Sequence, residues 1–179
     1  MRHPAFSVFL TSALALSLAA CASKPKPAAI AETPTAPSAP PQGDDYAPPS
    51  LDQGPQAQSL QQNLAATAGD RVFFALDSHQ LTAEARDVLQ AQARWLAQHP
   101  GVRVMIAGNA DERGTREYNF ALGARRAVAA RDALVAQGVS SGRISTVSYG
   151  KEKPIDPGSN EDAWARNRNA GTVVIDLAQ

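Results

Sequence analysis

The sequence predicts an α+β fold in which helices pack on a mixed sheet, preceded by a disordered tether. Three observations lead to this prediction. Residues 70–179 alternate short apolar runs with long helical patterns in the order β-α-β-α-β-(α)-β, and such alternation is typical of a sheet covered by helices. Residues 22–69 carry nine of the thirteen prolines. The 110 residues after them are enough for one modest core.

The first half of this domain contains two strands on either side of a helix. Residues 72–76 form an apolar, partly aromatic run, which favours a strand. Thr82 is a good N-cap for the helix that follows, and Pro100 and Gly101 end that helix. Residues 102–107 alternate between two sets of side chains and predict the second strand.

The second half adds a long helix, a strand, a short helix and a last strand. Residues 115–137 are rich in alanine and are followed by Gly138, a frequent residue just after a helix C-terminus. Residues 144–149 predict a strand, residues 161–168 a short helix, and residues 172–177 an alternating final strand. The order of the strands in the sheet does not follow from these patterns.

Composition excludes several classes of function. The 17 basic and 17 acidic residues cancel, so the chain lacks the positive field that drives nucleic-acid binding, and no nucleic-acid partner is expected. The single cysteine cannot form an internal disulfide, and the three histidines are too scattered to complete a structural zinc site with it. We expect no metal and no other cofactor.

The first twenty residues have the features of an export signal. Arg2 and His3 give a basic start, residues 6–20 are apolar and uncharged, and small residues precede Cys21. The apolar run is shorter than the ~20 residues that a transmembrane helix needs. We therefore expect residues 1–20 to be a removable signal peptide.

Residues 21–69 are expected to form a flexible tether that begins at Cys21. This segment is too rich in proline, alanine and glutamine to bury the apolar surface that would offset its ordering entropy. We expect it to be locally polyproline-like as far as about Gln56, with a loose helical turn or two in residues 58–68. The folded domain would then be residues 70–179.

The loop of residues 108–115, between the second strand and the second long helix, is the candidate binding site. Ligands often bind at such junctions. Asn119 and Arg126 lie seven residues apart on the following helix, so they share a face next to Leu122. Asp111 in the loop and Arg126 on the helix are therefore expected to line one pocket.

Two other functions for this loop fail on residue chemistry. A calcium loop would need oxygen ligands where Arg113 and Phe120 stand. An enzyme could use Asp111 and Glu112 as acid and base, but neighbouring side chains diverge, and no Ser/His or Cys/His arrangement lies nearby. We expect no catalytic activity. From the residues alone, a solvated turn with surface ion pairs remains an alternative.

Residues 108–115, with 117–119 and 122–127, resemble the peptidoglycan-binding motif of OmpA-like C-terminal domains. Residues 147–154 and the small residues before Cys21 are similar to those of the peptidoglycan-associated lipoproteins within that family. The resemblance covers roughly residues 72–177. It implies that peptidoglycan and the Tol-Pal system, with its periplasmic protein TolB, are the partners, and that the protein serves envelope integrity and cell division.

The same resemblance implies roles for individual residues. Asp111 and Arg126 match residues that hold the diaminopimelate side chain of the peptide stem, and Asn119 and Leu122 match residues that support this pocket. The chemistry agrees, because diaminopimelate ends in an ammonium and a carboxylate, which can pair with one carboxylate and one guanidinium.

Two positions depart from the common pattern of the family. Asn109 stands where histidine is frequent, and Asn169 stands where arginine is frequent, whereas Arg168 is as expected. Asn109 keeps hydrogen-bonding groups but does not titrate near neutral pH. We include Asn109 and Arg168 among the candidate ligand-binding residues.

The lipobox-like residues 18–21 imply that Cys21 becomes an acylated N-terminus. More than one acyl chain gives an anchor that does not readily dissociate. Ala22 stands where an aspartate would favour retention in the inner membrane, so the resemblance implies the periplasmic face of the outer membrane. The alternatives are a wall-binding lipoprotein outside the Tol system and, from another class, a periplasmic wall hydrolase.

We predict that Cys21→Ser stops acylation and releases the protein from the membrane while the domain stays folded, because anchor and core share no residues. Membrane fractionation with a folding assay measures both effects. If the variant still sediments with the outer membrane, Cys21 is not the anchor.

Overall fold

The computed structural model describes residues 54–177 of the chain. The signal peptide, Cys21 and most of the expected tether lie outside the described residues. The elements follow in this order: α1 (Pro55–Ala68), β1 (Arg71–Phe73), α2 (Ala83–Gln98), β2 (Val102–Asn109), α3 (Arg116–Ala136), a 3-10 turn (Ser141–Arg143), β3 (Ile144–Gly150), α4 (Glu161–Asn167) and β4 (Asn169–Leu177). Within residues 54–177, no helix combines the length and the apolar character needed to cross a bilayer.

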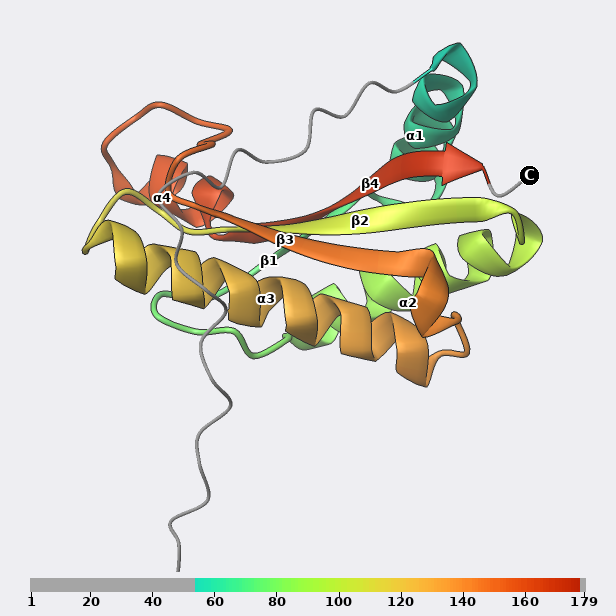
Figure 1. Cartoon of the computed structure of the whole chain (residues 1–179). Helices are drawn as coiled ribbons and strands as arrows, with labels where there is room; N and C mark the ends of the chain where they lie inside the picture. The colour runs from blue at the N-terminus through green and yellow to red at the C-terminus, as the bar shows by residue number, and fades with distance from the viewer. Residues whose placement is uncertain (1–53, 178–179) are drawn as a thin grey trace, which may run out of the picture. The chain divides into compact units, whose positions relative to one another are not determined.

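Four strands form one mixed sheet in the order β1-β4-β2-β3. β2 runs parallel to β3 and antiparallel to β4, and β4 runs antiparallel to β1. α2 and α3 lie on one face of the sheet, and α4 lies at the end where β2 leads into α3 (Figure 1). The predicted α+β class, with helices packed on a mixed sheet, is confirmed.

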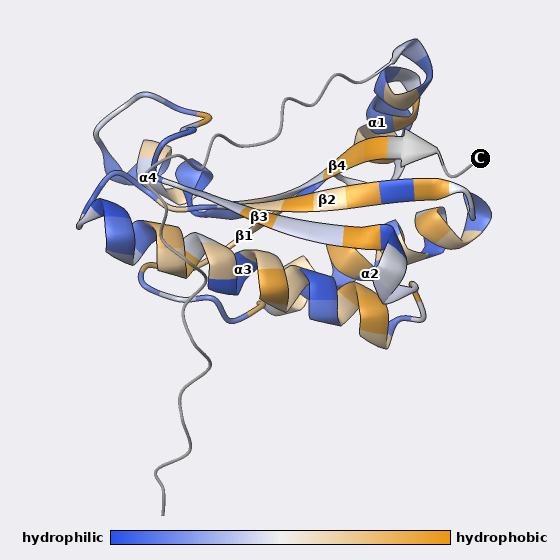
Figure 2. Cartoon of the chain, viewed as in Figure 1, coloured by the Kyte–Doolittle hydropathy of each residue, from blue (hydrophilic) through white to orange (hydrophobic). Residues whose placement is uncertain are grey.

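The core lies between this face of the sheet and the two long helices (Figure 2). Its fully buried side chains come from both layers: Leu89 and Leu96 of α2, Val104 and Ile106 of β2, Leu134 of α3, and Val174 of β4. Thr82 and Thr115 cap α2 and α3, because their side chains accept hydrogen bonds from the backbone N–H of Ala85 and Tyr118. The N-terminal boundaries of both long helices therefore agree with the sequence patterns.

The first and last strands begin and end at other residues than the sequence predicts. β4 begins at Asn169, three residues before the alternating pattern starts, because residues 169–171 pair with β1. β1 ends at Phe73, and the next backbone N–H, that of Phe74, donates to the carbonyl of Arg168 at 2.8 Å.

α1 belongs to the folded domain, and this differs from the expectation of a flexible segment as far as Gly69. Leu64 is fully buried. Trp95 Nε1 in α2 donates to Asn63 Oδ1 at 2.7 Å, and Gln92 Nε2 donates to the carbonyl of Gly69 at 2.8 Å. The sequence predicts only a loose helical turn or two here. Ala57, Leu60, Leu64 and Ala68 pack on the core along one side of the helix, but two of these four are alanines, so the apolar stripe is weak in the sequence.

α1 also covers a free strand edge. Beyond its pairing with β1, β4 would expose unpaired backbone groups. Gln61 occupies this edge: its Oε1 accepts from Val174 N at 2.8 Å, and its Nε2 donates to Thr172 O at 3.2 Å. One side chain thus replaces part of a neighbouring strand and attaches α1 to the sheet.

We predict that Leu64→Ala lowers the free energy of unfolding by about 2–5 kcal/mol, the usual cost of truncating a buried leucine. Gln62→Ala, an exposed change on the same helix, should change it by less than about 0.5 kcal/mol. Urea unfolding of both variants measures the difference. Equal effects would mean that α1 does not pack on the domain.

Candidate functional site

A pocket of about 240 Å³ opens where the loop between β2 and α3 faces the segment that follows β1. Four of the sequence-predicted residues line it: Asp111, Asn119, Leu122 and Arg126. The volume is below the ~300–1,000 Å³ of most small-molecule sites. The pocket therefore suits a group about the size of one side chain.

Two glycines bring α3 close enough to form this pocket. A Cβ on Gly108 of β2 would lie 1.9 Å from the carbonyl oxygen of Gly123 in α3, and a Cβ on Gly123 would lie 2.4 Å from Ser148 Oγ of β3. No larger residue fits at either position without moving the helix. This close contact sets Asn119 and Arg126 beside the end of β2.

Arg126 is fully buried and holds three segments together. Its Nε donates to Ser78 O at 2.8 Å, its Nη1 to Asn109 O at 2.8 Å, and its Nη2 to Ala75 O at 3.2 Å. Burial lowers the pKa of Arg126 to about 10, so it remains a cation at neutral pH. A guanidinium has five N–H donors, and these three bonds do not exhaust it.

Asp111 provides the negative charge of the pocket and is 6% exposed. Its carboxylate accepts hydrogen bonds from Arg113 Nε at 3.1 Å, from Arg113 Nη2 at 2.8 Å and from Arg168 Nη1 at 3.5 Å. Burial by itself would raise the pKa of Asp111, but the hydrogen bonds and charge of Arg113, with Arg168, outweigh burial and lower the pKa. The carboxylate is therefore ionised at neutral pH.

Asn119 and Leu122 form the α3 side of the pocket. Asn119 is 2% exposed, and its Nδ2 donates to Arg113 O at 2.7 Å. Leu122 is 4% exposed. Asn119 therefore holds the loop against the helix in addition to lining the pocket.

Asn109 and Arg168 do not line the pocket but support it from behind. The carbonyl of Asn109 accepts the bond from Arg126 described above. Arg168 joins three groups: its Nε donates to Phe74 O at 3.2 Å, its Nη2 donates to Glu161 Oε1 at 2.8 Å, and its Nη1 contacts Asp111. Neither residue lines the pocket, so their assignment as ligand-binding residues stays a prediction.

The side chains of Asn109 and Asn169 contact each other. Asn109 Nδ2 donates to Asn169 Oδ1 at 2.9 Å. Arg71 of β1 reaches the same oxygen, with Nη1 at 2.6 Å. Asn109 Oδ1 is buried without a hydrogen-bond partner. A neutral amide pair with a guanidinium from another strand thus occupies this part of the interior.

The pocket wall also contains residues with no predicted role. Leu76 and Asp77 lie outside the binding motif, whereas Ala110, Arg113, Gly114 and Tyr118 belong to it. Tyr118 Oη donates to Asp77 Oδ1 across the pocket rim. Asp77 has a positive φ of 52°, which aspartate tolerates better than most residues. An aspartate directly after an apolar strand was the available signal, but no local pattern pairs it with a tyrosine 41 residues away.

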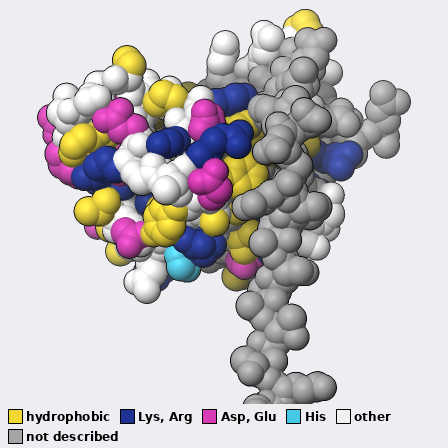
Figure 3. Space-filling model, turned by 60° about the vertical axis from the view of Figure 1, so that its left-hand side comes forward, with side chains coloured by type: hydrophobic (Ala, Val, Ile, Leu, Met, Phe, Trp, Pro, Cys, Tyr) yellow, Lys and Arg dark blue, Asp and Glu magenta, His cyan; other side chains and the backbone are white. Residues whose placement is uncertain are grey.

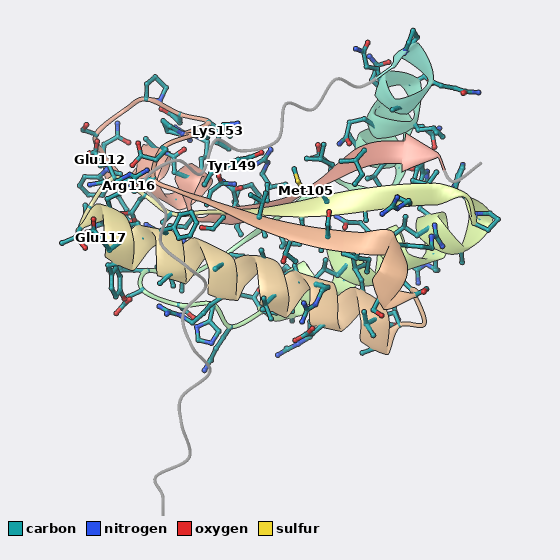
Figure 4. All side chains as sticks on the ribbon, viewed as in Figure 1. Met105, Glu112, Arg116, Glu117, Tyr149 and Lys153 are labelled. Carbon is teal, nitrogen blue, oxygen red and sulfur yellow. The ribbon has the colours of Figure 1, made fainter. Side chains whose placement is uncertain are left out.

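The end of the domain around α4 and the start of α3 presents acidic and basic side chains side by side (Figure 3). Glu112, Arg116 and Glu117 lie at this end (Figure 4). Glu112 Oε1 accepts a hydrogen bond from Trp164 Nε1 at 2.9 Å, and Lys151 Nζ donates to the carbonyls of Glu112 and Gly114. Within residues 54–177, no three His, Cys, Asp or Glu side chains gather as metal ligands.

Comparison with known proteins identifies related chains. The model of the OmpA family matches residues 73–168. A peptidoglycan-associated lipoprotein of Rhizobium meliloti (strain 1021) is 43% identical over 167 residues, which cover 93% of this chain and 86% of the relative. One of Agrobacterium fabrum is 49% identical over 121 residues, 68% of each chain.

Solved structures agree with this comparison. The crystal structure of the peptidoglycan-associated lipoprotein from Burkholderia pseudomallei has a TM-score of 0.57 at 45% identity, over 59% of this chain and 89% of that chain. The C-terminal domain of Helicobacter pylori MotB has a TM-score of 0.57 at 22% identity and covers 61% of this chain and 86% of that one, so it is similar in fold alone.

We predict that Asp111 stabilises the domain at neutral pH and that this stabilisation is lost in acid. Because its pKa in the folded state lies below the ordinary value of 3.8, its ion pairs contribute fully above about pH 5 and are lost as the pH falls through the lowered pKa. The stability difference between wild type and Asp111→Asn should therefore be largest near neutral pH and shrink on acidification. Urea unfolding from pH 7 to pH 3 measures it.

Asp132→Asn is the control, because Asp132 is exposed and pairs with Arg131 at the surface. Its difference from wild type should stay small throughout. If the stability difference between wild type and Asp111→Asn does not change with pH, the lowered pKa of Asp111 is contradicted.

Proposed function

Because the chain belongs to the OmpA family and, within it, to the peptidoglycan-associated lipoproteins, we propose that its pocket binds the peptide stem of the cell wall without covalent chemistry. In this proposal, acylated Cys21 holds the protein on the periplasmic face of the outer membrane. The protein then links that membrane to peptidoglycan.

One observation carries the proposal: a single small pocket has both an ionised carboxylate and a buried guanidinium in its wall, from Asp111 and Arg126. The side chain of diaminopimelate ends in an ammonium and a carboxylate, and it is about the size of group that the pocket accepts. Asp111 would pair with the ammonium, and the N–H groups of Arg126 beyond its three internal bonds would pair with the carboxylate. A stem with lysine lacks the carboxylate, which should weaken binding by about 1–3 kcal/mol.

The wall of the pocket favours binding over hydrolysis. Its side chains are Leu76, Asp77, Ala110, Asp111, Arg113, Gly114, Tyr118, Asn119, Leu122 and Arg126. This set includes no serine, cysteine or histidine that could act as nucleophile or base. Its two aspartates already have partners, Arg113 and Arg168 on Asp111 and Tyr118 on Asp77. A wall hydrolase would release soluble fragments from purified sacculi, whereas a binding protein releases nothing.

We further propose membership of the Tol-Pal system, with TolB and other Tol-Pal components as partners. Support comes from the resemblance of residues 147–154 to the lipoproteins of that system and from the relatives described above. The alternative is a wall-binding lipoprotein that works outside this system. The test is whether the full chain captures TolB from periplasmic extract with peptidoglycan absent. Capture supports membership of the Tol-Pal system, and no capture supports a lipoprotein outside it.

We predict that Asp111→Asn weakens binding to diaminopimelate-containing sacculi by about 30-fold or more, the effect of removing one partner from a buried charge pair. Glu112→Gln is the matched control: it removes the adjacent carboxylate, which bonds to Trp164 outside the pocket wall, and should change binding less than about fivefold. Co-sedimentation of the full chain with purified sacculi measures both variants.

Circular dichroism establishes that the variants are folded. Arg126 is a poor choice for this test, because its removal would take the donor from the carbonyls of Ala75, Ser78 and Asn109 and would destabilise the domain. Wild-type binding by Asp111→Asn, or complete loss of binding in Glu112→Gln, would refute the assignment of the pocket.

A further inference from the structure

The carboxylate of Asp111 is already occupied by groups of the protein itself. Oδ1 accepts from the backbone N and the Nε of Arg113, both at 3.1 Å. Oδ2 accepts from Arg113 Nη2 at 2.8 Å and from Arg168 Nη1 at 3.5 Å. A carboxylate offers about four lone-pair positions, so a ligand ammonium must replace one of these donors to reach a good hydrogen-bonding position.

Of the two arginines, Arg113 is the one that can leave. The side chain of Arg168 is 8% exposed, and it is fixed by Phe74 O and Glu161 as well as by Asp111. The side chain of Arg113 is 35% exposed, so water can replace its contacts. The hydrogen bond from its backbone N–H to Asp111 does not depend on where the side chain lies.

The Arg113 guanidinium already has partners other than Asp111. Its Cζ lies 4.0 Å from the centre of the Trp164 ring, and its Nη1 lies 3.7 Å from Glu161 Oε2. Trp164 is held in position by its hydrogen bond to Glu112. A guanidinium that gives up Asp111 therefore keeps an aromatic face and a carboxylate beside it.

We propose that Arg113 acts as an internal competitor: in the free protein its guanidinium occupies the position on Asp111 that the ligand ammonium takes on binding. The inference rests on the proposed function and adds a determinant of affinity and selectivity to it. The ligand exchanges one ion pair for another, while Arg113 keeps its contacts with Trp164 and Glu161. A ligand without a cationic group cannot replace a guanidinium, so Arg113 helps to reject neutral stems.

The competition must be weak enough for a ligand to overcome. An ion pair with one partner this exposed changes an equilibrium constant by only about two- to fivefold. A ligand that also engages other parts of the pocket can readily exceed this. If Arg113 instead bound the ligand carboxylate directly, its removal would lower affinity, so the two roles have effects of opposite sign.

The test compares Arg113→Gln with wild type by calorimetric titration of the full lipidated chain in detergent micelles. The ligand is a synthetic stem tripeptide that ends in meso-diaminopimelate. Arg113→Gln should bind about fivefold more tightly. Loss of structure cannot produce such a gain, and thermal unfolding records whether the fold is kept.

Arg116→Gln is the matched control. Arg116 lies three residues along the chain, its side chain is 65% exposed, and it pairs with Glu152 at 3.4 Å. The change removes the same charge from the same end of the domain without altering the contacts of Asp111. The affinity of Arg116→Gln for the tripeptide should stay within about twofold of wild type. If both variants gain affinity equally, the gain comes from the change in net charge, and the proposal is overturned.

Salt dependence gives a second readout. In wild type the ligand replaces an existing ion pair, whereas in Arg113→Gln it creates a new one, so affinity should fall more steeply with added salt in the variant. Equal slopes, or an affinity of Arg113→Gln that is unchanged or weaker, would overturn the exchange.

Asp111→Asn separates this failure from failure of the proposed function. If wild type does not bind the tripeptide, or Asp111→Asn binds it equally well, the pocket assignment itself is wrong. If Asp111→Asn loses binding and Arg113→Gln gains none, only the competitor role of Arg113 is refuted.

Discussion

The site depends on the hydrogen bonds of the buried Arg126 guanidinium. It joins α3 to the end of β2 and to the segment after β1 through bonds to three backbone carbonyls. A buried charge is costly unless it is hydrogen-bonded and balanced by an opposite charge, and Asp111 supplies the balancing charge. These bonds set the positions of the pocket walls before any ligand arrives. Preorganisation of this kind reduces the ordering cost of binding.

The whole chain has a formal net charge of zero. Around the pocket, acidic and basic side chains alternate over short distances. Asp111 lies between Arg113 and Arg168, and both arginines reach Glu161. A zwitterionic group can enter such a network by exchanging partners, without leaving an unpaired charge in a partly buried place. The same feature makes the site unsuited to polyanions, which need one sign of charge over a wide surface.

The interior next to the pocket contains a coupled pair of amides. Asn109 and Asn169 lie 60 residues apart in the chain, yet their side chains are hydrogen-bonded, and Arg71 bonds to the same Asn169 oxygen. Because the carbonyl of Asn109 also accepts from Arg126, this pair supports the wall of the site from behind. Two residues that look independent in the sequence thus form one structural unit.

Local signals in the sequence determined most of the elements and the site loop: Thr82 as a helix cap, Gly138 after the second long helix, and the loop of residues 108–115 with Asp111 and Arg126 near one pocket. Tertiary contacts alone decided the strand order, the packing of α1 through Leu64 and the place of Arg113 on Asp111. The division has a physical reason. Caps and amphipathic periods arise from residues within a few positions of one another, so they can be read from the chain. A helix with few apolar residues is stabilised by distant partners, and the donors around a carboxylate come from wherever the fold brings them.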